Sequence, residues 1–460
     1  MSPMPNEPDQ PVTKEDAETD LIIRAYARKG VEVKRGRGWW PEDDQYDEPQ
    51  DKQPDKPEEK PQHEPEDWDF LYQEGVILVR DTYLPEVGRI LGRQLSVLDS
   101  FMDGLTVLSL NKAENPKFRS VIPAIDEIDV QLGPGVATPN HIFWLTPVHC
   151  CPATEPVEVP LHALPDPGVC DGGGEGVLVY VSDTGLLPEA SDHPWLAGVT
   201  GKPDELEPTS DGALLIPEYA GHGTFIAGVA RCMAPASAVY VARDFKVAGT
   251  VSEIQLVRRL NDALRRGADV ISVSAGGFTR RHLPPLSFEY FWNRFRHYKG
   301  VALVAAAGNN SQRKPFWPAA FPQVVGVGAL AANGRARAYF SDFGPWVDVY
   351  APGEDLVNAF AKGTYVCREP PDAGHVRHFR GMARWSGTSF STPLVAGLIA
   401  ARMSRTGENG RQAADALLAR ARQQALPGVG PVLYPCDTGA VCRCKTEDPC
   451  EHRHCRCGRC

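Results

Sequence analysis

Three short stretches of the sequence place a carboxylate, an imidazole and a hydroxyl where a chemical site could form. They are VSDTG with Asp183, GHGTFIAG with His222, and GTSFSTP with Ser389. A serine hydroxyl is a weak nucleophile until an imidazole removes its proton, and the imidazole needs a carboxylate that fixes its tautomer. The three residue types, in the order Asp, His, Ser, therefore predict nucleophilic catalysis by Ser389.

Each stretch also has an ordinary structural explanation. Asp-Thr-Gly suits a turn, a single histidine among 12 is more often structural than catalytic, and Ser389 could cap the buried helix that LVAGLIA predicts. His222 stands apart because its flanking glycines leave space for a partner side chain. Since all three stretches fall at predicted junctions of strands and helices, catalysis explains them better than three unrelated turns and caps.

The elements that must position these residues form an alternating series from residue 177 onward. Continuous apolar runs such as VLVYV and DVISV are typical of parallel strands that are buried on both faces. The stretch 252–267 opens with a capping-box pattern at Ser252 and Gln255, which predicts a helix. The alternation predicts an α/β domain with a mostly parallel sheet, where chemistry collects at the carboxyl ends of strands.

Together these stretches resemble the subtilisin-like serine proteases, the subtilases of peptidase family S8. The resemblance covers residues 176–403 and includes FSDFGPWVDVYAPG upstream of the nucleophile. AAAGN resembles the strand end that supplies the family's oxyanion-hole asparagine, here Asn309. SVSAGG resembles the strand that pairs with the backbone of a bound peptide, which implies substrate binding by Ser274, Ala275 and Gly276.

The resemblance implies a three-layer subtilisin-like fold and a serine endopeptidase that hydrolyses protein or peptide bonds through an acyl-enzyme. Asp183 would orient His222, which acts as general base and then general acid for Ser389. Asn309 would stabilise the oxyanion, and the chemical step needs no cofactor.

Two further hypotheses concern the role of such a domain. The first is a catalytically silent binding module of the same fold that presents its terminal segments to partners. The presence of all four polar residues speaks against it, because inactive relatives usually lose one of them. The second keeps the catalysis and makes the protein a regulated intracellular processing protease with a dedicated substrate.

The chain outside the catalytic region divides by composition. Residues 1–69 are rich in proline and acidic side chains and poor in large apolar ones, which predicts a disordered tail with a short helix around LIIRAYARK. Residues 70–152 predict a small α+β module with a helix over 84–101. The Pro- and Gly-rich stretch 153–176 predicts a flexible linker to a peptidase domain at 177–435.

The small module occupies the place where many subtilases carry a propeptide, which assists folding and blocks the cleft. The module resembles a propeptide only in its position in the chain and in its mixture of predicted strands and helices. We expect intramolecular inhibition by residues 70–152, ended by cleavage in 153–176. A fixed accessory domain is the competing hypothesis.

The charge of the chain is concentrated at its beginning. The net charge is −11, of which residues 1–70 carry −10 and residues 71–460 carry −1. A nearly neutral folded part predicts no nucleic-acid partner. The first residues show no secretory signal and no apolar run is long enough to span a membrane, so we expect a cytoplasmic protein without a membrane partner.

The last segment, 436–460, contains 7 of the 12 cysteines together with His452 and His454. Its C-x-C and C-x-x-C spacings suit zinc, whereas an oxidising compartment would favour a disulfide framework. Because we expect a cytoplasmic protein, in which cysteines stay reduced, we predict zinc rather than disulfides. No individual metal ligand can be chosen from this segment. No Asp-rich loop suggests calcium ligands, and the sequence does not define the side-chain preference for substrates.

Overall fold

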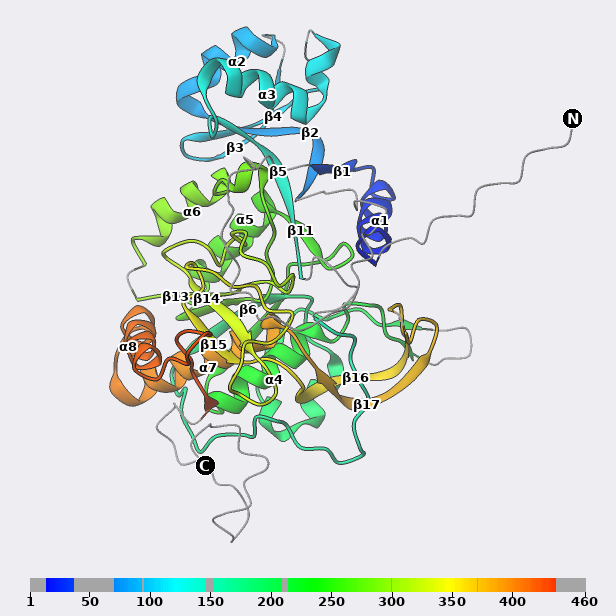
Figure 1. The fold of residues 1–460 in the computed structure, drawn as a ribbon, viewed down its shortest axis with the longest axis vertical. Helices are drawn as coiled ribbons and strands as arrows, with labels where there is room; N and C mark the ends of the chain where they lie inside the picture. The colour runs from blue at the N-terminus through cyan, green and yellow to red at the C-terminus, as the bar shows by residue number, and fades with distance from the viewer. Residues whose placement is uncertain are drawn as a thin grey trace, which may run out of the picture.

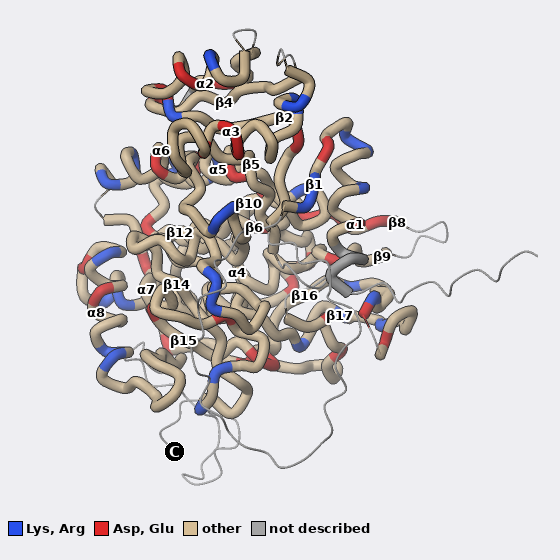
Figure 2. Tube along the Cα trace, turned by 45° about the horizontal axis from the view of Figure 1, so that its top comes forward, with Lys and Arg blue, Asp and Glu red and all other residues tan. Residues whose placement is uncertain are grey.

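The computed structural model describes nine segments of the 460-residue chain, which lie between residues 14 and 435. They are residues 14–36, 70–92, 95–111, 113, 115–145, 153–208, 214–298, 300–369 and 371–435. The predicted cysteine-rich segment 436–460 lies outside the described residues, as do 1–13 and 37–69 of the predicted acidic tail. Within the described segments, no helix is both long and apolar enough to cross a membrane. Figure 2 shows acidic and basic residues interspersed along the described chain.

A seven-stranded parallel sheet forms the centre of the larger body (Figure 1). Its order is β15-β14-β13-β12-β6-β10-β7. The strands, in chain order, are β6 (Leu178–Asp183), β7 (Thr200–Gly201), β10 (Ala238–Arg243), β12 (Val270–Val273), β13 (Ala302–Ala306), β14 (Val325–Leu330) and β15 (Val349–Pro352). Every pairing in this sheet is parallel. The predicted α/β domain with a mostly parallel sheet is therefore confirmed.

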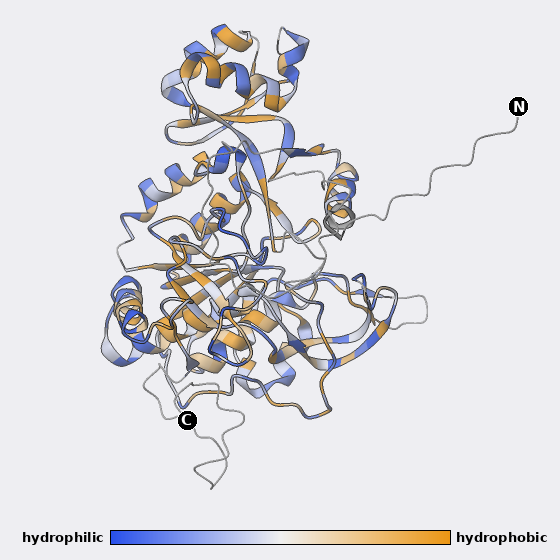
Figure 3. Ribbon diagram, viewed as in Figure 1, coloured by the Kyte–Doolittle hydropathy of each residue, from blue (hydrophilic) through white to orange (hydrophobic). Residues whose placement is uncertain are grey.

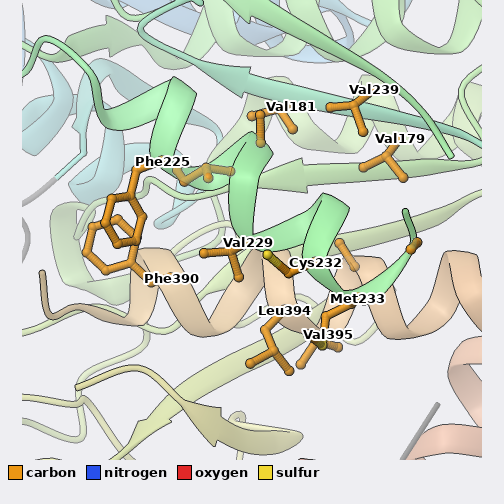
Figure 4. Close-up of a cluster of buried hydrophobic side chains, with 14 of the residues drawn as sticks. Val179, Val181, Phe225, Val229, Cys232, Met233, Val239, Phe390, Leu394 and Val395 are labelled. Carbon is orange, nitrogen blue, oxygen red and sulfur yellow. The ribbon is translucent and has the colours of Figure 1, made fainter. Parts of the chain in front are cut away.

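Helices cover both faces of this sheet and make a three-layer arrangement. They are α4 (His222–Met233), α5 (Glu253–Arg265), α6 (Leu286–Phe295), α7 (Thr388–Thr406) and α8 (Gly410–Gln423). Successive side chains of a strand point to opposite faces, and β6 illustrates this. Val179 and Val181 pack with α4 and α7 (Figure 4), whereas Tyr180 lies in the cluster formed with α5 and α6.

The hydropathy of the helices follows their position. Figure 3 shows mainly hydrophobic residues on α4 in the centre, while α8 at the edge carries hydrophilic residues on its outer side. In α7, Leu394, Leu398 and Ile399 are at most 1% exposed, as the apolar sequence predicts for an enclosed helix. The predicted cap of α5 is also present, because the side chain of Ser252 accepts the N–H of Gln255.

A second sheet belongs to the N-terminal module. Its strands are β1 (Val33–Gly36), β2 (Phe70–Arg80), β3 (Ser96–Met102), β4 (Leu105–Ser109), β5 (Ala137–Trp144) and β11 (Thr250–Ser252). The helices α2 (Leu84–Leu91) and α3 (Val121–Leu132) pack on it. The helix predicted over 84–101 is wrong in its second half: α2 stops at Gly92, whose φ of 106° is outside the helical region, and β3 follows.

The short helix predicted around LIIRAYARK is present, but the prediction of disorder is wrong for the rest of residues 14–36. Residues 14–36 form α1 (Lys14–Ala27) and β1, and β1 pairs antiparallel with β2. Ile22 and Tyr26 of α1 are buried in the module's core. A polar composition concealed this structure because the helix needs few apolar residues once another surface covers them.

The predicted flexible linker 153–176 is instead packed against the larger body. Val157 pairs with Arg384 and Asp166 pairs with Val357 through backbone hydrogen bonds of 2.8–2.9 Å. These bonds add the linker to a mixed sheet of β8 (Glu207–Pro208), β9 (Leu214–Leu215), β16 (Leu356–Val366) and β17 (Val376–Trp385), in which only β9 and β16 pair in parallel. Proline and glycine therefore mark an irregular but ordered path here.

Five short 3-10 helices complete the described elements. They are η1 (Asp81–Tyr83), η2 (Pro116–Arg119), η3 (Pro188–Asp192), η4 (Pro194–Leu196) and η5 (Arg280–His282). Four of these helices connect longer elements within one body, and η5 lies against the N-terminal module through contacts that involve Arg280.

We predict that Leu398→Ala destabilises the protein by about 2–5 kcal/mol, because it deletes a fully buried side chain from α7 and leaves a cavity. Thermal unfolding measured by circular dichroism checks this. The matched control is Leu164→Ala, which removes a side chain that is 78% exposed and leaves the midpoint nearly unchanged. Equal shifts for both variants would contradict the assignment of the core.

Candidate active site

Asp183 is the last residue of β6, at the carboxyl edge of the parallel sheet. Its strand lies between β12 and β10, so the carboxylate emerges near the middle of the sheet. One of its oxygens, Oδ1, accepts the backbone N–H of Thr184 at 2.8 Å. The side chain is fully buried, which holds the carboxylate in one orientation.

His222 is the first residue of α4, and its ring meets Asp183. The distance between Nδ1 and Oδ1 of Asp183 is 2.8 Å. This contact assigns the proton to Nδ1, because a carboxylate only accepts. Nε2 has no hydrogen-bond partner among the residues that the structure describes, so it is the nitrogen that can accept a proton.

A glycine before His222 allows this placement. Gly221 has φ of 86°, a left-handed conformation that residues with a side chain rarely adopt. A Cβ at this position would lie 2.7 Å from the ring of Phe360, so the space is also filled. The glycines around His222 therefore serve backbone geometry and close packing, and the predicted space for a partner side chain is filled by Phe360 and by the backbone of Gly185.

Ser389 is the second residue of α7, and the next residue, Phe390, packs against His222. Among the described residues no hydrogen bond joins the Ser389 hydroxyl to Nε2 of His222. The ring centroids of His222 and Phe390 are 5.5 Å apart, and the ring of Trp385 meets His222 edge-on at 5.6 Å. The Ser389 hydroxyl donates to the carbonyl of Ser274 in a long bond of 3.4 Å. Catalytic hydrogen bonds are often loose without substrate, and rotation about one bond re-aims this hydroxyl.

Asn309 follows β13 and contacts the start of the same helix. Its Oδ1 accepts both the backbone N–H and the hydroxyl of Thr388, each at 2.9 Å. Because these bonds occupy Oδ1, the amide nitrogen Nδ2 is the atom that can donate to a bound group. The structure thus brings the side chain of Asn309 into contact with Thr388, the residue before Ser389.

The three residues predicted to bind substrate lie just after β12. Ser274 donates its hydroxyl to the carbonyl of Ser389 at 2.8 Å, which couples this segment to the nucleophile. Ala275 is buried. Gly276 exchanges two backbone hydrogen bonds of 2.9 Å with Trp144, at the end of β5. The N-terminal module therefore already pairs with the segment that was predicted to receive a peptide.

One polar residue, Asp204, supports the site without having been predicted from the sequence. Oδ2 of Asp204 accepts the hydroxyl of Thr184 and the N–H of Gly221, each at 2.8 Å, and these neighbours adjoin Asp183 and His222. Burial raises the pKa of the Asp204 carboxyl to about 6. The loop KPDELEP carries no spacing pattern that separates Asp204 from the nearby acids.

The described part of the chain gives no indication of metal or thiol chemistry. No group of three or more His, Cys, Asp or Glu side chains there could hold a metal ion. Cys170, Cys232 and Cys367 are buried. Cys232 is a fully buried core side chain, and burial raises the pKa of its thiol to about 12. The zinc prediction concerns residues outside the described segments.

Comparison with known families matches residues 174–429 to the subtilase family, which is more than half of the chain. Over 249 residues the chain is 32% identical to a thermophilic serine proteinase of Bacillus sp. (strain AK1), which covers 52% of this chain and 54% of that protein. It is 30% identical over 256 residues to thermitase of Thermoactinomyces vulgaris, covering 53% and 81% of the two chains. The chain thus spans about half the length of the first of these relatives.

The fold is also similar to a solved structure. Fervidolysin from Fervidobacterium pennivorans, described as a keratinolytic enzyme related to subtilisin, superposes with a TM-score of 0.53 at 18% identity. The match covers 80% of this chain and 61% of that one. The predicted three-layer subtilisin-like fold is confirmed.

We predict that Asp204→Asn gains stability relative to the wild type as the pH rises from about 4 to 6. Because the pKa of Asp204 is raised in the folded protein, its neutral carboxyl group contributes fully to stability at a pH below the pKa of the unfolded state. This contribution is lost as the pH rises past about 6. Asparagine stays neutral throughout. Melting temperatures at pH 4 and pH 7 check this, with Glu207→Gln, an exposed acid of the same loop, as control. A constant difference between Asp204→Asn and wild type would contradict it.

Proposed function

This chain belongs to the subtilase family, and we propose that it is a serine endopeptidase that hydrolyses protein or peptide bonds through an acyl-enzyme. The single observation that supports this most is the buried His222, with Nδ1 bonded to Asp183 and Nε2 unpartnered among the described residues beside the start of α7. A binding module has no need of that arrangement. In a serine endopeptidase, the carboxylate orients the imidazole and stabilises the imidazolium that forms during proton transfer.

In the proposed reaction, the Ser389 oxygen bonds to the substrate carbonyl carbon as Nε2 of His222 takes the hydroxyl proton. Collapse of the tetrahedral intermediate breaks the C–N bond, and Nε2 returns the proton to the leaving amine. Water then repeats the sequence on the ester, which releases the acid and restores Ser389. Asp183 stabilises the imidazolium in each half-reaction without being protonated.

The developing oxyanion is assigned two donors. These are Nδ2 of Asn309 and the backbone N–H of Ser389, at the positive end of α7. Oδ1 of Asn309 is bonded to Thr388, so the amide cannot turn its oxygen towards the negative charge. Such donors act on the transition state more than on the bound substrate.

We expect Ser389→Ala to lose all labelling by a fluorophosphonate probe and His222→Ala to lower turnover by about 10⁶-fold, the loss that such substitutions cause in subtilisin. Gel fluorescence and hydrolysis of a quenched peptide library measure the two effects. Ser391→Ala, which removes a buried hydroxyl bonded to Ala351, is the matched control and should still be labelled. Absence of labelling in the wild type under all conditions would favour the catalytically silent binding module.

We further propose that the N-terminal module inhibits this enzyme while it is attached. The end of β5 lies between two other segments of the chain. Trp144 pairs with Thr250 of β11 on one side and with Gly276 on the other. The N–H of Leu145 donates to the carbonyl of Gly249 at 3.0 Å. A substrate that adds a strand along Gly276 needs the same backbone groups, so it must displace β5.

Buried charge pairs hold the module in this position. Arg280, which is 8% exposed, binds Asp126 and Asp129 of α3. His141 of β5 contacts the carboxylate of Glu253, and neither residue is more than 1% exposed. Together with the backbone pairing of β5 and β11, these contacts fix the orientation of the module on the larger body.

We predict that Leu145→Pro raises the rate of peptide hydrolysis by about 2–10-fold over wild type. Proline removes the N–H that binds Gly249, and one such hydrogen bond contributes about 0.5–1.5 kcal/mol. Leu145→Ala keeps the N–H and controls for the lost side chain. Equal rates for the proline and alanine variants would contradict inhibition through this strand pairing.

A dedicated processing role follows from the same proposal, because an enzyme whose cleft is covered acts only after a release step. Release by cleavage within 153–176 stays a prediction. The backbone pairs of Val157 and Asp166 hold that segment against β17 and β16, so a protease would first have to detach it.

A further inference from the structure

A buried carboxyl group, Asp342, lies beside the asparagine assigned to the oxyanion hole. Its backbone N–H donates to the carbonyl of Gly308 at 2.9 Å. Its Oδ1 accepts the N–H groups of Asn310 at 2.8 Å and Gln312 at 3.0 Å. Asp342 therefore binds the chain on both sides of Asn309.

The second carboxyl oxygen of Asp342 lies in a tightly filled space. Oδ2 is buried and has no hydrogen-bond partner among the described residues. A Cβ built on Gly308, whose φ is 105°, would lie 2.3 Å from Oδ2, so the carboxyl group is packed directly against this glycine. Two N–H groups thus donate to Oδ1 of Asp342, while Oδ2 packs against the backbone of Gly308.

The surroundings of Asp342 favour a neutral carboxyl group. Burial raises its pKa well above the usual range. Arg337 and Tyr350 are the titratable groups that act on it. Arg337 lowers the pKa less than burial raises it, and its guanidinium donates to the carbonyls of Ala338 and Ser341. A protonated carboxyl keeps Oδ1 as an acceptor and avoids an uncompensated buried charge.

We propose that Asp342 is a positioning residue for the oxyanion hole, which holds residues 308–312 through its backbone N–H and its carboxyl group so that the amide of Asn309 stays aimed at the substrate carbonyl. The inference rests on the proposed peptidase function. Asn309 is then fixed from two directions, since Thr388 binds its side-chain oxygen. Preorganised donors of this kind lower the barrier because they do not reorient during the reaction.

The effect of this positioning should appear in turnover rather than in substrate binding, because the oxyanion forms only along the reaction path. We expect Asp342→Ala to lower kcat by about 10–100-fold with KM unchanged, which is less than the 10²–10³-fold that removal of an oxyanion donor causes. Asp342→Asn keeps a neutral acceptor in the same place. It should restore kcat to within about 3-fold of wild type.

A double-mutant cycle in the full-length protein provides the decisive test. Peptide hydrolysis and the rate constant of fluorophosphonate labelling are measured for Asp342→Ala, for Asn309→Ala and for the pair. If Asp342 acts through Asn309, its substitution causes no further loss of rate in the Asn309→Ala background. Independent, multiplicative losses would overturn the proposal, and so would an Asp342→Asn variant as slow as Asp342→Ala.

Two controls separate positioning from stability and from the proposed function itself. Asp348→Ala removes another buried carboxyl that accepts a backbone N–H, that of Gly326, and should lower the melting temperature without the loss of kcat. If Asp342→Ala does not fold, Asp342→Ser takes its place in the cycle. If both the wild type and the Leu145→Pro variant neither hydrolyse nor are labelled, the peptidase function is rejected, whereas an active protein with multiplicative losses rejects only the role of Asp342.

Discussion

The hydrogen bond between His222 and Asp183 is the interaction on which the catalytic arrangement depends. It joins residues 39 positions apart in sequence, and both side chains are almost completely withdrawn from water. A buried carboxylate is costly unless its oxygens are bonded. Oδ1 of Asp183 is bonded to His222 and to the N–H of Thr184, whereas Oδ2 has no hydrogen-bond partner among the described residues. The bond to His222 forms at the carboxyl edge of the parallel sheet, where β6 ends at Asp183 and α4 begins at His222. The helix α7 then brings Ser389 to the same edge.

The same edge also explains why the N-terminal module is part of the functional unit. Its sheet includes β11, a strand contributed by the chain between β10 and α5 of the larger body. Two bodies that share a sheet cannot separate without breaking backbone hydrogen bonds. Since β5 reaches from this shared sheet to Gly276, the strand that joins the bodies also pairs with the segment that we propose as the peptide-binding edge. Attachment and the proposed inhibition therefore have one structural cause.

Local sequence patterns predicted the elements of the larger body well, because long apolar runs and helix caps report on their own surroundings. They failed where distant parts of the chain decide the outcome. The stretch 84–101 has helical residues throughout, yet its second half pairs with β4. The linker 153–176 is rich in Pro and Gly, yet backbone bonds to β16 and β17 order it. Residues 14–36 look polar, yet the module covers their few apolar side chains.

The sequence by itself determined which residues carry the chemistry, since Asp183, His222, Ser389 and Asn309 stand in stretches whose residue types and order suit one reaction. Only the tertiary structure decided how they are held. Asp204 and Asp342 act on neighbours of those residues through backbone N–H groups, which leave no mark in a sequence. A hydrogen bond to a main chain depends on where the chain runs and hardly at all on which side chains it bears. The supports of the site, and the strand that covers it, therefore become visible only in three dimensions.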